Sequence, residues 1–319
     1  MMPAAPHVAV IGSGSIGVAF AVVFARAGFE VAVTDVDADA LARGRSDLDV
    51  RLELLENAGM LGAPRGEVAA RVRFGTDVAR AVGGAELVQE CAPEQKDVKR
   101  AVFREVAAAA PAHAVLASSA SAILPSEIAI ELPDDVAARV IVGHPGNPPY
   151  LLPVIEVVPT PRTSPDALGL ARSLYAAAGL RPVTIRREVE GFVFNRLQGA
   201  LLREAYCLVR DGVVDVDDID EIVRSGLGRR WSVIGPFETS DLNTRGGIAS
   251  HAVKMGPAYG RMGAERGQHD PWTPELVEEV EAQRRALLPL EAWEARGRWR
   301  DDQLLAHTAL WEGAAATAR

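Results

Sequence analysis

The fold is decided by one stretch near the start of the chain, Val8-Ala9-Val10-Ile11-Gly12-Ser13-Gly14-Ser15-Ile16-Gly17. Apolar residues typical of a buried strand lead into a Gly-x-Gly-x-x-Gly turn that opens a helix. Gly12 permits the tight turn, Gly14 lets the backbone approach a diphosphate, and Gly17 allows the helix to pack closely on the strand. The predicted helix begins at Ile16, so Ser15 and Ile16 lie at its N-terminus, where backbone N–H groups and the positive end of the helix dipole favour an anion. The stretch therefore predicts a turn that binds a dinucleotide.

The next predicted strand, Glu30–Asp35, ends in a carboxylate at the spacing expected of a dinucleotide-binding unit. Asp35 can accept a hydrogen bond from a ribose 2′-hydroxyl, and its charge repels a 2′-phosphate. No arginine follows it directly, so we predict NAD rather than NADP as the cofactor. The alternative is a glycine turn in a similar fold that binds another ligand or none.

Short apolar runs alternate with helical patterns through the first half of the chain, which is typical of an α/β fold. The predicted strands are His7–Ile11, Glu30–Asp35, Leu87–Glu90, Ala114–Ser118, Arg139–His144, Val154–Val158 and Pro182–Arg186, with helices such as Ile16–Ala27 and Gln95–Ala110 between them. Mostly apolar strands indicate a parallel sheet covered on both faces. From Gly191 onward the strand pattern is lost, and Phe192–Val209 predicts a long apolar helix. We expect a Rossmann-type doubly wound sheet in residues 1–188, followed by an all-α C-terminal domain in residues 189–319.

The composition argues against several other classes of protein. The chain has 319 residues, of which 48% are hydrophobic and 24% charged, as in a globular protein. Its net charge of −9 argues against nucleic acid or an anionic membrane as partner, and no apolar run has the roughly 18 residues of a membrane span. The N-terminus lacks a basic segment followed by an apolar run, so we expect no signal peptide and a cytoplasmic protein. Cys91 and Cys207 lie in apolar contexts, and we expect both to be reduced.

A second informative run is Gly143-His144-Pro145-Gly146-Asn147-Pro148-Pro149-Tyr150-Leu151-Leu152-Pro153-Val154-Ile155-Glu156-Val157-Val158. Glu156 interrupts an apolar strand, where a carboxylate must be paired, hydrogen-bonded or neutral. His144 ends the preceding strand, at the sheet edge where α/β folds bind ligands, and the proline-rich turn would bring the two residues together. We therefore predict that Glu156 binds one imidazole nitrogen and leaves the other to exchange a proton with a substrate. A structural histidine at a strand end is the alternative.

These runs resemble the L-3-hydroxyacyl-CoA dehydrogenase superfamily, in which a His-x-x-Asn-Pro run is followed by a glutamate. The run His-Pro-x-Asn-Pro-Pro-Tyr is similar to the lambda-crystallin / L-gulonate 3-dehydrogenase branch of that superfamily. Further similar runs are Gly191-Phe192-Val193-Phe194-Asn195-Arg196-Leu197, Gly226-Leu227-Gly228-Arg229-Arg230-Trp231, Gly235-Pro236-Phe237-Glu238-Thr239 and the tail Trp299-Arg300-Asp301. The resemblance covers nearly the whole chain. It implies a metal-free, NAD-dependent dehydrogenase that oxidises a CH–OH group.

The resemblance also implies roles for individual residues. His144 is the general acid–base and Glu156 its orienting partner. Ser121 matches a serine that binds the substrate hydroxyl, and Asn195 matches an asparagine that contacts substrate near the nicotinamide. Ala120 departs from the family, in which a threonine is common there. From the residues alone, Ser121 could instead cap a turn and Asn195 could bond backbone within the core.

The resemblance places Asn147 in substrate binding, and Glu94 and Lys99 near the cofactor. For a free carboxylate we predict Arg230, because a guanidinium can bind a carboxylate through two hydrogen bonds; a surface arginine is the alternative. The predicted substrate is then a small 3-hydroxy acid such as L-gulonate. The alternatives are an acid like carnitine or 3-hydroxybutyrate, a 3-hydroxyacyl thioester on CoA or a carrier protein, and a crystallin-like structural role. The family also implies a homodimer, for which Phe192–Val209 is the expected contact.

Overall fold

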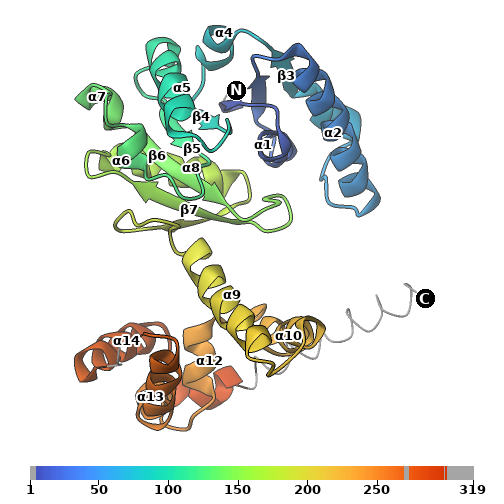
Figure 1. The fold of residues 1–319 in the computed structure, drawn as a ribbon. Helices are drawn as coiled ribbons and strands as arrows, with labels where there is room; N and C mark the ends of the chain where they lie inside the picture. Colours follow the sequence, from blue (N-terminus) through green and yellow to red (C-terminus); the bar gives the residue numbers. More distant parts are fainter. Residues whose placement is uncertain (1–4, 269–272, 298, 300–319) are drawn as a thin grey trace. The chain divides into compact units, whose positions relative to one another are not determined.

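The computed structural model describes residues 5–268, 273–297 and 299, and the chain divides into two compact units, Met1–Leu202 and Arg203–Arg319 (Figure 1). Of the predicted tail motif, Arg300 and Asp301 lie outside the described residues. The first unit contains the sheet, and the described part of the second unit is helical. Each unit is therefore described by itself.

Within the described residues, the sheet of the first unit has eight strands in the order β3-β2-β1-β4-β5-β6-β7-β8. The strands are β1 (His7–Ile11), β2 (Glu30–Thr34), β3 (Val72–Gly75), β4 (Leu87–Glu90), β5 (Val115–Ser118), β6 (Val140–Pro145), β7 (Val154–Pro159) and β8 (Arg181–Thr184). The six strands from β3 to β6 are parallel, β7 is antiparallel to β6, and β8 is parallel to β7. The prediction of a parallel sheet is therefore wrong for the last two strands. The loop between Pro145 and Val154 is too short for a helical crossover, so β7 returns beside β6 in the opposite direction.

The edge strand β3 is absent from the sequence-based prediction. Its four residues are Val72, Arg73, Phe74 and Gly75, and only Val72 is buried. So short a run carries too little alternation to indicate a strand. It forms because β2 offers a parallel partner, with Val31 opposite Val72.

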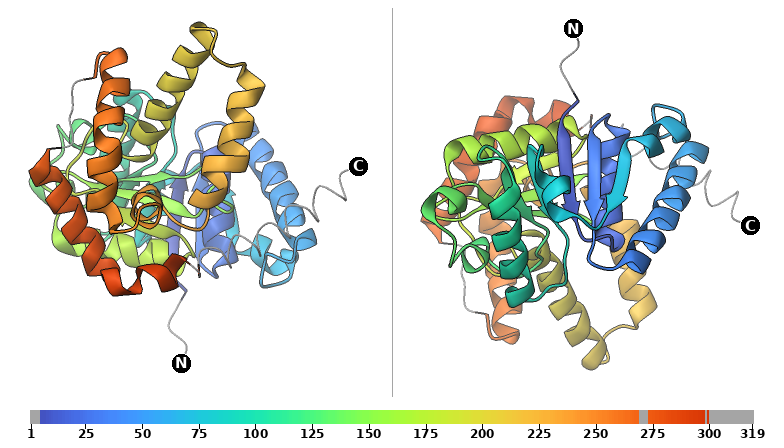
Figure 2. Two further views of the ribbon diagram at one scale, coloured as in Figure 1. Left: turned by 90° about the horizontal axis from the view of Figure 1, so that it is seen from below. Right: turned by 90° about the horizontal axis from the view of Figure 1, so that it is seen from above.

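Helices cover both faces of this sheet (Figure 2). They are α1 (Ser15–Arg26), α2 (Ala38–Asn57), α3 (Arg65–Ala70), α4 (Val78–Val82), α5 (Lys96–Ala109), α6 (Pro125–Ile128), α7 (Asp134–Ala137) and α8 (Pro165–Ala177). Val8 and Val10 of β1 pack with α1, α2 and α8, whereas Ala9 and Ile11 pack with α4 to α7 on the other face. Alternate side chains of a strand point to opposite faces, so β1 contributes to both cores. The predicted doubly wound α/β fold is confirmed.

Helix α9 (Phe194–Arg210) begins later than predicted and is amphipathic rather than apolar. Gly191 and Phe192 have φ angles of 74° and 48°, so the chain turns there before the helix starts. None of its residues is buried, and its exposed apolar side chains are Leu197, Leu201, Leu202, Tyr206 and Val209. The prediction of an apolar helix from Phe192 is therefore wrong in start and character, because a high apolar content alone does not distinguish a buried helix from one with a single apolar face.

The described part of the second unit contains helices and turns only, which confirms the predicted all-α C-terminal domain. Its elements are α10 (Val216–Ile222), a π-helical turn (Val223–Leu227), α11 (Gly228–Trp231), α12 (Pro236–Leu242), α13 (Gly247–Glu265), α14 (Pro274–Leu287) and a 3₁₀ turn (Leu290–Ala292). Asp241 is buried; its carboxylate accepts a hydrogen bond from the Ile248 N–H at 2.8 Å and binds the Arg285 guanidinium. Asp241 thus joins α12, α13 and α14. Over the described ranges, no helix combines the length and apolar character needed to cross a bilayer.

Candidate active site

The glycine turn after β1 has a geometry that side chains would disrupt. Gly12 has a φ of +104°, and a Cβ built there would lie 2.8 Å from the Cys91 carbonyl oxygen. A Cβ on Gly17 would lie 1.9 Å from the Gly12 carbonyl oxygen, whereas a Cβ on Gly14 would have no neighbour within 4 Å. The first and third glycines are therefore required by the packing of the protein itself. Gly14 borders open space, which leaves the N-terminus of α1 accessible to a ligand.

The carboxylate of Asp35 lies at the end of β2, beside this turn. Its Oδ2 atom accepts hydrogen bonds from the Ser13 N–H at 2.7 Å and the Ser13 hydroxyl at 2.9 Å. Burial alone would raise the pKa of Asp35, but hydrogen bonds from Ser13 and from the backbone of Asp37 and Val36 lower it below its ordinary value. The group is thus an anion at neutral pH, and Oδ1 accepts a longer hydrogen bond, of 3.2 Å, from the Asp37 N–H.

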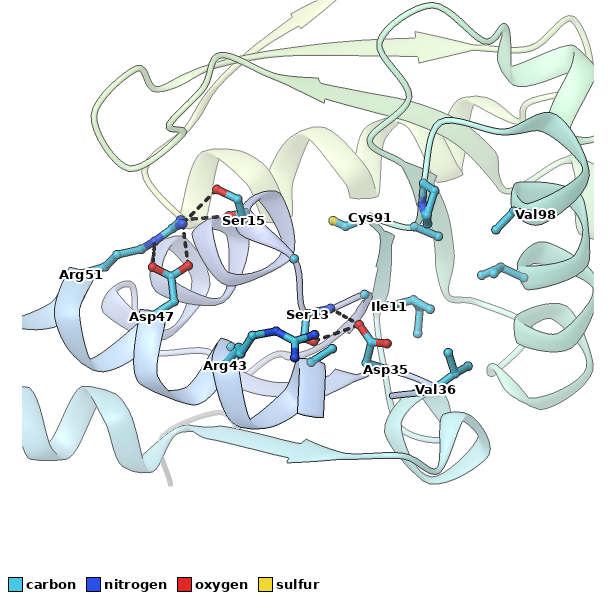
Figure 3. A pocket seen from close by; sticks show the side chains of 17 residues that line it. Ile11, Ser13, Ser15, Asp35, Val36, Arg43, Asp47, Arg51, Cys91 and Val98 are labelled. Atoms are coloured by element: carbon cyan, nitrogen blue, oxygen red, sulfur yellow. Dashed lines mark hydrogen bonds and ion pairs between the residues drawn. The ribbon is translucent and has the colours of Figure 1, made fainter. Parts of the chain in front are cut away.

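A pocket of about 740 Å³ opens between these elements (Figure 3). It is lined by the glycine turn, Asp35, residues of α2 and the segment after β4, among them Gly12, Gly14, Ser15, Arg43, Asp47, Arg51, Cys91 and Pro93. Helix N–H groups at one end suit a diphosphate, and a carboxylate at the other suits a ribose diol. The residues present therefore fit a dinucleotide without a 2′-phosphate.

His144 and Glu156 lie directly opposite each other on the antiparallel strands β6 and β7. Their side chains are buried, and His144 Nδ1 lies 2.8 Å from Glu156 Oε2. Glu156 Oε1 accepts hydrogen bonds from the N–H groups of Val193 and Phe194, at 2.8 and 3.0 Å, where α9 begins. Burial alone would raise the pKa of Glu156, but the hydrogen bond to His144 and those two N–H groups lower it. An ionised carboxylate at this position favours the tautomer with the proton on Nδ1, which leaves Nε2 without one.

Ser121 and Asn195 are also neighbours, although they are far apart in sequence. The Asn195 side-chain amide donates a hydrogen bond to the Ser121 carbonyl oxygen at 3.0 Å. Glu94 Oε1 accepts the N–H groups of Ser121 and Ala122, at 2.8 and 3.1 Å. Asn195 follows directly after Phe194, whose N–H binds Glu156, so the first turn of α9 connects the serine loop with the histidine–glutamate pair.

Lys99, which was expected near the cofactor, belongs to a buried ionic cluster. The sequence did not predict this cluster. Its ammonium group donates to both oxygens of Glu90, at 3.0 and 3.1 Å, and lies 3.4 Å from Glu94 Oε2. Ser118 donates a 2.5 Å hydrogen bond to Glu90 Oε2. Burial raises the pKa of Glu90 although Lys99 and Ser118 oppose that shift. One signal in the sequence could have indicated this cluster. Glu90 is an acidic residue at the end of the apolar strand β4, in the same way that Asp35 is an acidic residue directly after β2.

The two remaining predicted site residues are Asn147 and Arg230. Asn147 is exposed in the loop after β6, and Arg230 lies on α11 of the second unit. Within the part of the chain that the structure describes, the Arg230 Nε atom is buried without a hydrogen-bond partner. An unsatisfied guanidinium N–H is costly unless a ligand or another group completes it. Among the described residues, no group of three or more histidine, cysteine or acidic side chains could hold a metal ion.

Comparison with known proteins assigns both parts of the chain to one family. Residues 7–189 match the 3-hydroxyacyl-CoA dehydrogenase, NAD binding domain, and residues 191–287 match the 3-hydroxyacyl-CoA dehydrogenase, C-terminal domain. The chain belongs to the 3-hydroxyacyl-CoA dehydrogenase family. It is therefore an NAD-dependent dehydrogenase that acts on CH–OH groups, as the sequence predicted.

Several relatives within this family are similar over most of their length. Lambda-crystallin of Oryctolagus cuniculus is 34% identical over 95% of each chain. L-carnitine dehydrogenase of Streptomyces griseus is 39% identical over 86% of this chain and 81% of its own. Among solved structures, the NAD⁺-dependent dismutase 5-formyl-3-hydroxy-2-methylpyridine 4-carboxylic acid 5-dehydrogenase has a TM-score of 0.72 and 30% identity, covering 93% of this chain and 99% of its own.

The two family domains meet around residue 190, whereas the compact units divide between Leu202 and Arg203. The difference lies in α9. Its first turn is bound to Glu156 and to the Ser121 loop, so it groups with the sheet although the family's C-terminal domain begins before it. In this member of the 3-hydroxyacyl-CoA dehydrogenase family, the start of the helical domain is thus part of the histidine–glutamate site.

Proposed function

We propose that the enzyme oxidises the 3-hydroxyl of a small free 3-hydroxy acid, such as L-gulonate, to the 3-keto acid. The observation that carries the proposal is the buried pair of His144 and Glu156, in which one ring nitrogen is held and the other is left for substrate. The sites assigned below to substrate and cofactor belong to the same proposal.

Bound NAD supplies the hydride acceptor, and the protein supplies the proton chemistry. His144 Nε2 takes the proton of the substrate hydroxyl as the C–H hydride leaves, so the products are a ketone, NADH and an imidazolium. Glu156, held ionised by the N-terminus of α9, stabilises that imidazolium. The Ser121 hydroxyl and the Asn195 amide hydrogen-bond the reacting oxygen. Acid–base help of this kind contributes about a hundred- to ten-thousand-fold in rate.

The charges of the α2 region favour a free acid over a CoA thioester. A CoA moiety carries phosphates and is bound best by unpaired cations. Here the basic side chains are paired: Arg43 with Asp37, Arg51 with Asp47, Arg65 with Glu53 and Glu56, and Arg73 with Glu30. Arg45 and Arg71 donate to backbone carbonyls. Along this stretch the structure thus offers no unpaired basic patch for phosphates.

Arg230 is the residue proposed to bind the substrate carboxylate, because its buried Nε–H has no hydrogen-bond partner among the described residues. Relatives named for carnitine, a free acid, fit the same substrate class, and an acid of the carnitine type is the second candidate. A relative named 3-hydroxyacyl-CoA dehydrogenase is 34% identical over 79% of this chain. A 3-hydroxyacyl-CoA thioester must therefore be tested as a substrate beside the free acids.

The test is a panel of L-gulonate, L-carnitine, 3-hydroxybutyrate and 3-hydroxybutyryl-CoA, each with NAD and NADP, with NADH fluorescence as the readout. We expect NAD-dependent turnover of a free acid and a kcat/KM at least about tenfold lower for the CoA ester. Arg230→Met should raise the KM for the acid about tenfold or more, since a charged hydrogen-bonded contact is lost, and leave the ester unaffected. Preference for the ester, or an unchanged KM in Arg230→Met, would refute the assignment.

We also propose a cytoplasmic homodimer. The exposed apolar side chains of α9 include Leu197, Leu202 and Tyr206, which are 62%, 45% and 77% exposed. Exposed apolar side chains along one helix are costly in water and suit a contact with a second copy. Cys91 and Cys207 are free thiols, as expected in a reducing compartment. Light scattering of the wild type and of Leu197→Glu tests the dimer, which the substitution should dissociate.

A further inference from the structure

Arg51 of α2 has contacts that neither the glycine motif nor the catalytic pair accounts for. Its Nη1 donates to the Ser15 carbonyl oxygen at 2.9 Å, and its Nη2 donates to the Ser15 hydroxyl at 3.0 Å. Asp47, one turn earlier, accepts from Nε at 2.9 Å and lies 2.6 Å from Nη2. The Arg51 side chain is only 13% exposed. Figure 3 shows the guanidinium between Ser15 and Asp47 at the edge of the cofactor pocket.

The same guanidinium also lies near the ring of Tyr150. The Arg51 Cζ atom lies 5.8 Å from the centre of the Tyr150 ring, within the range of a cation–π contact. The Tyr150 carbonyl oxygen accepts a hydrogen bond from Arg26 at 3.3 Å. A residue of α1 therefore binds the backbone of Tyr150, and a residue of α2 contacts its ring. Tyr150 belongs to the loop between His144 and Glu156. Arg51 therefore touches both the glycine turn and the catalytic loop.

We propose that Arg51 is a cofactor-site residue that couples binding of the NAD diphosphate at the glycine turn to the position of the loop Gly146–Pro153. The part that concerns catalysis rests on the proposed function of His144. Because Ser15 Oγ accepts from Arg51, the hydroxyl hydrogen of Ser15 is free to donate into the pocket, to a phosphate oxygen. The nearby positive charge strengthens that interaction. When no ligand is bound, Asp47 keeps the Arg51 guanidinium oriented. A bound diphosphate would strengthen the hydrogen bonds from Arg51 to Ser15 and its cation–π contact with the Tyr150 ring.

The binding half of the proposal is tested with ADP-ribose and NADH, by calorimetry and fluorescence. Arg51→Met should raise both dissociation constants about three- to tenfold. Arg51→Lys should recover less than half of that loss, because an ammonium cannot bind Ser15 and Asp47 in the same bidentate way. Ser15→Ala, which removes the hydroxyl without touching the arginine, should give an effect of similar size. The matched control is Arg45→Met, since Arg45 lies on the same helix, donates to the Phe74 carbonyl and covers the Phe74 ring but does not contact the glycine turn.

The coupling half is tested by amide hydrogen exchange of Tyr150–Leu152 with and without ADP-ribose, at equal fractional saturation of each variant. Wild type and Arg45→Met should show about tenfold slower exchange when the ligand is bound, and Arg51→Met should show none of that slowing. Unchanged dissociation constants in both Arg51→Met and Ser15→Ala, or equal slowing in wild type and Arg51→Met, would overturn the proposal. Neither readout needs turnover, so failure of the proposed substrate class would leave this result unaffected.

Discussion

Replacing Glu156 with glutamine is the sharpest perturbation of the site, because it changes one atom in a buried contact. Glutamine Oε1 can still accept the N–H groups of Val193 and Phe194, which Glu156 Oε1 accepts now. The second oxygen, 2.8 Å from His144 Nδ1, becomes an amide donor. The imidazole must then accept at Nδ1 and carry its proton on Nε2. That tautomer cannot take a proton from the substrate.

The size of the loss follows from the charge that Glu156 supplies. A carboxylate and an imidazolium with charge centres about 4 Å apart interact by about 4 kcal/mol at an effective dielectric constant of about 20. Losing that stabilisation in the transition state corresponds to about a thousandfold in kcat. The fold should tolerate the isosteric change, with a loss of about 1–2 kcal/mol in the free energy of unfolding.

The assay is kcat at saturating substrate and NAD, together with the dissociation constant of NADH. We expect the Glu156→Gln variant to bind NADH as the wild type does and to lose turnover about a thousandfold. The control is Glu131→Gln, which removes an exposed partner of Arg104 and should change kcat less than about twofold. A Glu156→Gln variant with kcat within tenfold of wild type would refute the assigned role of the pair.

The remaining predictions concern cofactor selection, the glycine turn and pH. Asp35→Ala should raise the Kd of NADH about tenfold, as measured by fluorescence titration. The ratio of the Kd of NADPH to the Kd of NADH should become smaller than in wild type. Gly17→Ala should lower the free energy of unfolding in urea by about 1–3 kcal/mol, because its Cβ would collide with the Gly12 carbonyl; Gly14→Ala should leave stability unchanged and weaken NADH binding. The folded-state pKa of Glu156 lies below its ordinary value of 4.5, so its stabilisation is present above that pH and lost as the pH falls through the folded-state pKa. Urea unfolding should therefore show a steeper acid loss in wild type than in Glu156→Gln.

The sequence predicted those parts of the site whose constraints are local. The glycine turn, Asp35 and the strand-end position of His144 each depend on a few neighbouring residues and on rules of strand geometry. The pairing of His144 with Glu156 was also accessible, because a charged residue in an apolar strand needs a partner and the two residues are joined by one short loop. Their roles in catalysis stay predictions until the variants are measured.

The parts that the sequence did not predict depend on contacts between distant segments. Lys99 and Glu90 lie nine residues apart, but Ser118 reaches the same carboxylate from another strand. Nothing in the residues around Arg51 indicates that its guanidinium meets Ser15, 36 positions away. The pairing of β3 is missing for the same reason, because a four-residue edge strand is defined by the neighbour it pairs with rather than by its own pattern.

The antiparallel return of β7 explains why the pairing of His144 with Glu156 is so well specified. In an antiparallel ladder the side chains of directly opposite residues lie on the same face, which is how His144 and Glu156 meet. A slip of one residue would turn every side chain of β7 to the other face, moving Glu156 away from the imidazole and burying its charge without a partner. The cost of that unpaired carboxylate disfavours the slipped register. The same buried charge that serves the proposed proton transfer therefore helps to fix the strand register on which the site depends.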